Sequence, residues 1–100
     1  MAVKILIKRR LPLDREKAQH IVAIFRQLRM LALEQEGYIS SETLRSREYP
    51  QEFLVISTWR SFEDWQKWFA SRGRNELHSK VDKLLESGTT YEAYEFGFMS

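Results

Sequence analysis

Residues 53–71, FLVISTWRSFEDWQKWFAS, change from one periodicity to another within a single stretch and thereby decide the fold. Residues 53–59 are rich in β-branched and aromatic side chains, which predicts a β-strand. From Ser61 onward the apolar side chains recur at the spacing of an amphipathic helix. Ser61 stands at the N-cap position and Asp64 follows it as in a capping box, so we expect a helix through about Ser71.

The beginning of the chain predicts another strand. Residues 2–10 alternate apolar and polar side chains, which is the period-two pattern of a half-buried strand. Ile5 and Ile7 share one face of this strand, and Arg9 continues that face toward the helices. Pro12 then ends the strand.

A helix and a further strand are expected between these two segments. Asp14 is a suitable N-cap for apolar residues that recur at helical spacing, and Gly37 closes this helix near its end. Alternation returns at Tyr38 and predicts a strand that joins residues 53–59 through a short turn. The alternation places Ile39 and Ser41 on one face of this strand and Tyr38 on the other.

The remaining segments complete an α+β arrangement. Gly73 interrupts the helical pattern before a second helix over residues 74–86, and Gly88 ends that helix. Residues 90–98 supply a last strand. The order β-α-β-β-α(α)-β predicts the ferredoxin-like fold, a four-stranded antiparallel sheet with helices on one face.

One face of this sheet is expected to need a partner. The helices do not cover it, yet it receives apolar side chains: Leu6, Leu44, Leu54, Ile56, Tyr94 and Phe96. A second copy of the chain would bury these side chains, so we predict a homodimer through the sheet face.

The composition limits the class of protein. The chain has 100 residues, 43% of them hydrophobic, and this predicts one domain over residues 1–100. It has no cysteine, which removes disulfides and favours the cytoplasm. No apolar run approaches the roughly 20 residues of a membrane-spanning helix. A formal charge of +2 provides no dedicated basic surface, so we expect no nucleic-acid partner.

Three residues are candidates for a ligand site. On a helix that turns about 100° per residue, Trp68 lies about 90° from the centre of the apolar stripe that contains Trp65. His78 lies about 75° to one side of the stripe of its own helix. We interpret Trp59 and Trp65 as packing residues. Trp68, His78 and Arg9 could border an apolar cavity between helices and sheet, or each could be an ordinary boundary residue.

Several common chemistries find no support in the sequence. It has no phosphate-binding glycine loop, no His-x-x-x-His pair and no Gly-x-Ser-x-Gly turn. It also has no cluster of Asp and Glu at metal-binding spacing, so we predict no metal site built from these residues. A nucleotide-binding protein or a hydrolase is therefore not expected.

Four segments together resemble a known family. They are VKILIKRRLPLDREKA (3–18), GYISSETL (37–44), VISTWRSFEDWQKW (55–68) and TTYEAYEF (89–96). Over nearly its whole length the chain is similar to the antibiotic biosynthesis monooxygenase (ABM) domain family. That resemblance implies a ferredoxin-like protomer in a dimeric α+β barrel.

The haem-degrading members of that family imply one set of roles. They use a histidine as axial iron ligand, a tryptophan against the porphyrin and an asparagine near the end of the first strand. The resemblance places His78 on the histidine and Trp68 on the tryptophan, whereas Arg9 stands at the asparagine. Arginine could pair with a haem propionate but would not reproduce the hydrogen bond of asparagine.

Other members are cofactor-independent oxygenases of polycyclic phenols or quinols, whose substrate carbanion itself reduces dioxygen. That resemblance implies His78 as the base, Trp68 stacked on the substrate and Arg9 beside the developing phenolate. The leading hypothesis is such a monooxygenase, with no cofactor. The alternatives are a haem-binding or haem-degrading protein with His78 as iron ligand, and a non-catalytic dimeric module.

Overall fold

The computed structural model describes residues 1–97, which form an antiparallel sheet and three helices. The strands are β1 (Val3–Arg10), β2 (Tyr38–Arg45), β3 (Glu52–Trp59) and β4 (Thr90–Glu95). The helices are α1 (Arg15–Leu33), α2 (Phe62–Phe69) and α3 (Arg72–Leu84). The sheet order β2-β3-β1-β4, with every neighbouring pair antiparallel, confirms the predicted ferredoxin-like α+β fold. The predicted end of the last strand, Phe98, lies outside the described residues.

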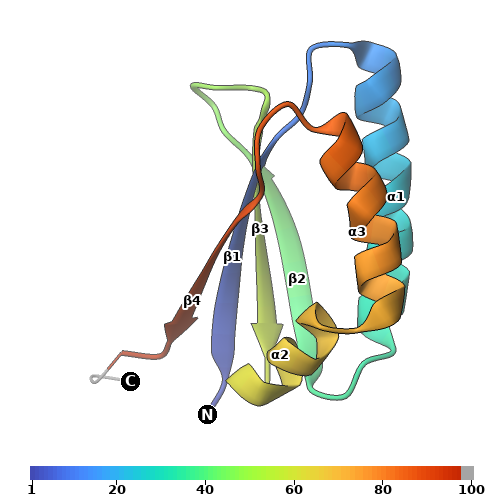
Figure 1. Ribbon diagram of the computed structural model, residues 1–100. Coiled ribbons are helices and arrows are strands. Elements are labelled where there is room, and N and C mark those ends of the chain that lie inside the picture. The colour runs from blue at the N-terminus through green and yellow to red at the C-terminus, as the bar shows by residue number, and fades with distance from the viewer. Residues whose placement is uncertain (98–100) are drawn as a thin grey trace.

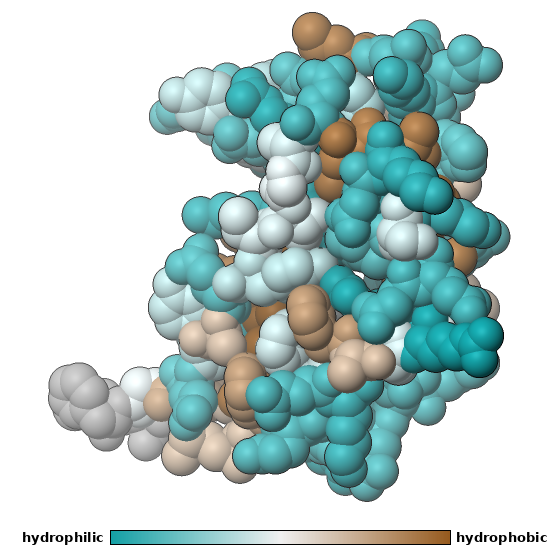
Figure 2. All heavy atoms as spheres, viewed as in Figure 1, coloured by the Kyte–Doolittle hydropathy of each residue, from teal (hydrophilic) through white to brown (hydrophobic). Residues whose placement is uncertain are grey.

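The helices and the sheet form two layers. All three helices lie on one side of the sheet, with α1 and α3 packed together (Figure 1). Ile21 and Val81 are fully buried between α1 and α3, while Val3, Ile5 and Trp59 form a second buried cluster on the sheet. Hydrophilic residues cover the outer surface of α3 (Figure 2). No helix within residues 1–97 is long and apolar enough to cross a membrane.

Serine side chains set the start of α2 and of α3. The Oγ of Ser61 accepts a hydrogen bond from the backbone N–H of Asp64 at 3.1 Å, which confirms the predicted N-cap. Ser71 caps α3 in the same way by accepting from Arg74 at 3.4 Å. Gly73 therefore lies inside the first turn of α3. The prediction that Gly73 separates the two helices is wrong, because the cap at Ser71 starts α3 earlier.

An irregularity at the start of β2 changes the direction of Tyr38. Tyr38 pairs with Trp59 while Ser40 pairs with Thr58, so Ile39 is an extra residue. Tyr38 consequently joins Ser41 on the helix-covered face, where its hydroxyl lies 2.8 Å from the Ser41 hydroxyl. The prediction that Tyr38 and Ser41 occupy opposite faces is wrong, because simple alternation does not anticipate a bulge.

The turn that leads into β2 also begins earlier than expected. α1 ends at Leu33 with Glu34 as its C-cap, so Gly37 lies beyond the helix and does not close it. Gly37 adopts a φ of 87°, a left-handed conformation that favours glycine. A Cβ at this position would also lie 2.2 Å from a carboxylate oxygen of Asp64. Gly37 therefore allows the turn to pass close to the start of α2.

The uncovered face of the sheet carries five of the six predicted apolar side chains, together with charged ones such as Lys8 and Glu92. The strand register aligns Leu6 with Ile56 and Leu44 with Leu54, and places Tyr94 on the same side. Leu44 and Tyr94 are 46% and 51% exposed, so a substantial apolar surface faces away from the helices.

Candidate functional site

A cavity of about 330 Å³ lies between the helical layer and the sheet, and all seven elements contribute to its lining. Its volume is within the range of small-molecule sites, roughly 300–1,000 Å³. Its wall is mainly aliphatic and aromatic. The exposed members of the lining are Arg26 and Arg29 of α1 and Thr43 of β2, so the cavity opens to solvent between these two elements.

Tryptophans form one side of the cavity. The rings of Trp59 and Trp68 stack with centroids 6.4 Å apart and an interplanar angle of 24°. Trp59 is 1% exposed, and Trp65 packs beside it in the same cluster, so the packing role predicted for both is confirmed. Both also line the cavity. Trp68 is half-buried and lines it as well, as the candidate-site interpretation requires.

His78 is buried more deeply than its helical position predicted. It is 5% exposed, and the buried residues of α3 are Arg74, His78 and Val81, which share one helix face. The prediction that His78 lies at the edge of the inner face of α3 is wrong, because that prediction assumed that the apolar residues of α3 form the inner face. The polar side chains of Arg74 and His78 face inward instead, toward the cavity.

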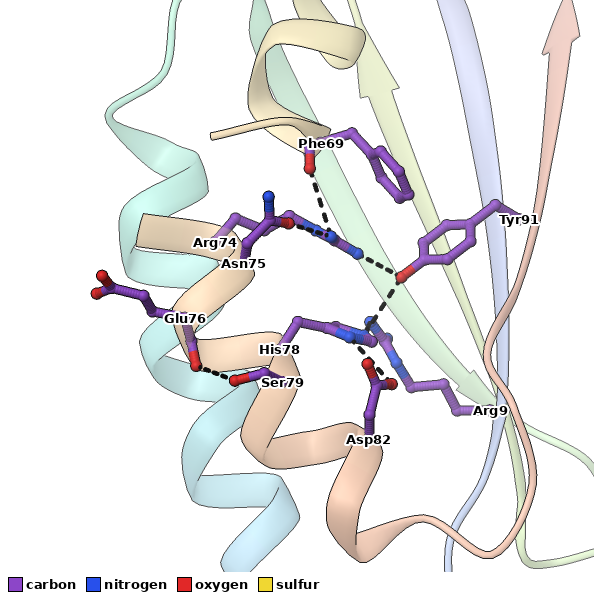
Figure 3. Close-up of polar contacts among 9 residues, drawn as sticks. All are labelled: Arg9, Phe69, Arg74, Asn75, Glu76, His78, Ser79, Asp82 and Tyr91. Atoms are coloured by element: carbon purple, nitrogen blue, oxygen red, sulfur yellow. Dashed lines mark hydrogen bonds and ion pairs between the residues drawn. The ribbon is translucent and has the colours of Figure 1, made fainter. Parts of the chain in front are cut away.

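A hydrogen-bonded network surrounds His78 (Figure 3). The Arg9 Nη2 lies 3.2 Å from the His78 Nε2, and a guanidinium can only donate, so Nε2 accepts. His78 therefore carries its proton on Nδ1, which lies 3.3 Å from the Asp82 carboxylate. The Tyr91 hydroxyl lies 3.3 Å from the same Nε2 and accepts a hydrogen bond from Arg74.

The surroundings of His78 favour its neutral form. Burial lowers the pKa of His78, and the positive charges of Arg9 and Arg74 lower the pKa further. Asp82 opposes this shift, since its carboxylate attracts the imidazolium. The pKa thus falls below its ordinary value near 6.5. At neutral pH His78 is a neutral imidazole with a basic lone pair on Nε2.

Two arginines extend into the lining beside His78. The Arg9 guanidinium lies over the ring of Phe25, 4.5 Å from its centroid, which confirms that its side chain points toward the helices. Its Nε is buried and has no hydrogen-bond partner. Arg74 is 8% exposed, and its guanidinium lies 4.1 Å from the ring centroid of Phe69. Stacking on these rings keeps both cations at the cavity despite their burial.

Sequence reasoning missed Arg74 and Tyr91. Arg74 was overlooked because a charged residue on a short helix usually faces solvent. Its spacing of four residues from His78 could have placed the two on the same face. The sequence predicts Tyr91 only as a strand residue, since nothing local to β4 indicates that its hydroxyl reaches α3.

The arrangement around His78 does not fit an axial bond to haem iron. Since Nδ1 donates to Asp82, only Nε2 could bind iron. That lone pair accepts from Arg9 and lies beside the Tyr91 hydroxyl. Iron there would lie against a guanidinium cation. No group of three or more His, Cys, Asp or Glu within the described part of the chain could hold a metal ion.

The sequence matches the family model described as antibiotic biosynthesis monooxygenase over residues 5–80. The chain belongs to this family. The resemblance is thus confirmed for this ABM protein, and the matched range takes in the first three of the four segments, apart from residues 3 and 4. No curated protein matches the sequence.

Solved structures share the fold of this ABM protein. A conserved protein from Methanosarcina mazei Go1 has a TM-score of 0.83 at 19% identity, over 94% of this chain and 91% of that one. SnoaB, a cofactor-independent oxygenase from Streptomyces nogalater, has a TM-score of 0.81 at 14% identity, over 96% and 93%. Rv0793 from Mycobacterium tuberculosis has a TM-score of 0.81 at 13% identity, over 95% and 94%.

Proposed function

We propose that this ABM protein is a cofactor-independent monooxygenase that acts on an aromatic phenol or quinol bound in the cavity. One observation carries the proposal: a neutral histidine presents its unprotonated Nε2 beside a buried guanidinium in a cavity lined by aromatic rings. The fold shared with SnoaB, described as a cofactor-independent oxygenase, supports the same activity. The proposed reaction requires no cofactor, because the substrate supplies the electrons.

His78 acts as the general base in this proposal. The substrate hydroxyl takes the place of the Arg9 Nη2 at the Nε2 lone pair, and Nε2 accepts its proton. The displaced guanidinium then stabilises the phenolate as it forms, which it can do for an anion and not for an iron cation. Trp68 stacks against the aromatic body of the substrate. The low pKa of His78 keeps the base unprotonated at neutral pH.

The substrate supplies the electrons. In the phenolate the negative charge is shared with a ring carbon, and this carbanion form reduces dioxygen and forms a carbon–oxygen bond to give a peroxide. The peroxide takes up the proton held by His78, and loss of the remaining C–H proton together with hydroxide, as water, leaves a carbonyl group. Counted from the keto tautomer of the substrate, a CH₂ group and O₂ become C=O and H₂O, so no external reductant enters.

Oxygen uptake with a hydroxyanthrone tests the assignment. We expect His78→Gln to lower the enzymatic rate about 100-fold, the size of effect that general-base catalysis supplies. His20→Gln is the matched control, because His20 is exposed on α1 and outside the cavity lining, and it should keep the full rate. Equal rates in the wild type and in His78→Gln would remove His78 as the base.

Haem binding through His78 makes a different prediction. It requires a sharp Soret band on addition of haem and its loss in His78→Ala. Because Arg9 and Tyr91 already surround Nε2, we expect no such band in the wild-type protein. A non-catalytic module would show neither a band nor oxygen uptake above the background rate.

The uncovered sheet face supports the proposal of a homodimer. Its apolar side chains would be removed from water by a second copy. Light scattering should give twice the mass of the chain, and Ile56→Lys should reduce the dimer to a monomer. Leu33→Lys, at an exposed apolar position on α1, should leave the dimer intact. A monomeric mass for the wild type at micromolar concentration would refute the proposal.

A further inference from the structure

We infer that the ligand of the cavity carries a carboxylate or similar anionic group, and that Arg26 and Arg29 at the cavity mouth bind it. The inference rests on the proposed function, because it specifies the chemical class of the substrate that the same cavity binds. It extends the site from the buried network to the solvent-exposed edge of α1.

The charge of the cavity is the first argument. Its lining contains four arginines and neither aspartate nor glutamate: Arg9, Arg26, Arg29 and Arg74. The chain as a whole is nearly balanced, with 16 basic and 14 acidic residues, so the excess is local. A concave, largely apolar surface strengthens the field of such charges and attracts anions.

The positions of Arg26 and Arg29 are the second argument. With Phe25 they lie on the face of α1 that lines the cavity. Neither side chain forms an ion pair or a side-chain hydrogen bond within residues 1–97. No acidic residue stands three or four positions from either arginine, and the two cations repel each other at their own spacing of three. Within the part of the chain that the structure describes, both charges therefore lack a counter-ion.

A buried donor supports the same orientation of the ligand. The Nε of Arg9 lies within the protein without a hydrogen-bond partner, although buried donors are normally satisfied. This Nε is closed off from the cavity in the structure, so a ligand oxygen would satisfy it once the guanidinium turns toward the ligand. The ligand would thus place its hydroxyl toward Arg9 and His78, its aromatic body against the tryptophans, and its anionic group at the mouth.

A matched pair of probes tests the inference by binding alone. Anthracene-2-carboxylate and anthracene-2-carboxamide have similar shape and differ in charge. Their dissociation constants can be measured by quenching of tryptophan fluorescence at low ionic strength, since Trp59 and Trp68 line the cavity. We expect the carboxylate to bind about tenfold more tightly, as expected for charge-assisted hydrogen bonds. Added salt should reduce this preference.

Two double variants distinguish a specific effect of Arg26 and Arg29 from an effect of the overall positive charge of the protein. In Arg26→Gln/Arg29→Gln we expect the preference for the carboxylate to disappear. Arg15→Gln/Lys17→Gln removes the same charge from exposed positions of α1 that do not line the cavity, and it should keep the preference. All four positions are exposed, so these variants should fold normally, which circular dichroism can verify.

The outcomes distinguish this inference from the proposed function. Equal affinity for the two probes, binding of neither, or a preference that survives in Arg26→Gln/Arg29→Gln would overturn the inference. Oxygen uptake would then still test the monooxygenase. A carboxylate preference that depends on Arg26 and Arg29, without oxygen uptake, would support the anion site and overturn the proposed function.

Discussion

The two faces of the sheet each carry side chains that a simple inside–outside rule assigns elsewhere. Under the helices, the nearly buried Arg74 and His78 form a polar network around a cavity. On the opposite face, Leu44 and Tyr94 are about half exposed. Buried charge and exposed apolar surface are both unfavourable in an isolated chain. Each face is therefore unfavourable by itself, and each proposal removes one of these costs: a ligand in the cavity for the covered face, and a second copy for the uncovered face.

The largest expected effect concerns neighbouring residues of β1 on opposite faces. Ile5 is fully buried under the helices, so Ile5→Ala should lower the free energy of unfolding by about 2–5 kcal/mol. Leu6→Ala, on the uncovered face, should cost about 1 kcal/mol in the monomer. Urea denaturation followed by circular dichroism measures both.

The protein concentration sharpens this test. If a second copy covers Leu6, the stability of the wild type rises with concentration and so does the cost of Leu6→Ala. Equal losses at Ile5 and Leu6 at low concentration would contradict the difference between the faces.

A smaller effect is expected from two tyrosines of β4. The Tyr91 hydroxyl joins Arg74 to His78, so Tyr91→Phe leaves a buried donor without its partner and should cost about 1–2 kcal/mol. The Tyr94 hydroxyl donates to Glu92 in solvent, so Tyr94→Phe should change stability by less than about 0.5 kcal/mol. Thermal and urea unfolding would measure both changes. A larger loss of stability in Tyr94→Phe than in Tyr91→Phe would contradict the expected difference between the two tyrosines.

The smallest effect is a dependence of stability on pH. The pKa of His78 is lower in the folded protein than its unfolded value near 6.5, so the unfolded chain binds more protons between these two values. The contribution of neutral His78 to the free energy of unfolding is fully present above about pH 6.5. The free energy of unfolding should decrease as the pH falls below this value. His78→Gln should flatten this slope between pH 7.5 and 5.5, whereas His20→Gln should retain it. An unchanged slope in His78→Gln would contradict the assigned shift.

Local patterns predicted most of the fold because they depend on neighbours in sequence. The alternation along β1 and the cap at Ser61 required no distant information. The bulge after Tyr38 and the face that α3 turns toward the sheet could not be predicted in this way, because the packing of whole elements decides both. The sequence pattern predicts that α3 starts after Gly73, whereas the cap at Ser71 starts the helix at Arg72.

The candidate site was predicted only in part for the same reason. Trp68, His78 and Arg9 were identified individually, and the structure brings all three to one cavity. Arg74 and Tyr91 complete the network from α3 and β4, and their contact joins residues 17 positions apart. The four-residue spacing places Arg74 and His78 on one face of α3, but nothing in the local sequence indicates that this face is buried or that Tyr91 contacts it.

The contribution of all seven elements to the cavity has a consequence for synthesis of the protein. β4 follows every other element in the chain, so it leaves the ribosome last. Until β4 pairs with β1, Tyr91 is missing from the wall and nothing joins Arg74 to His78. The wall of the cavity is therefore complete only once β4 has paired with β1.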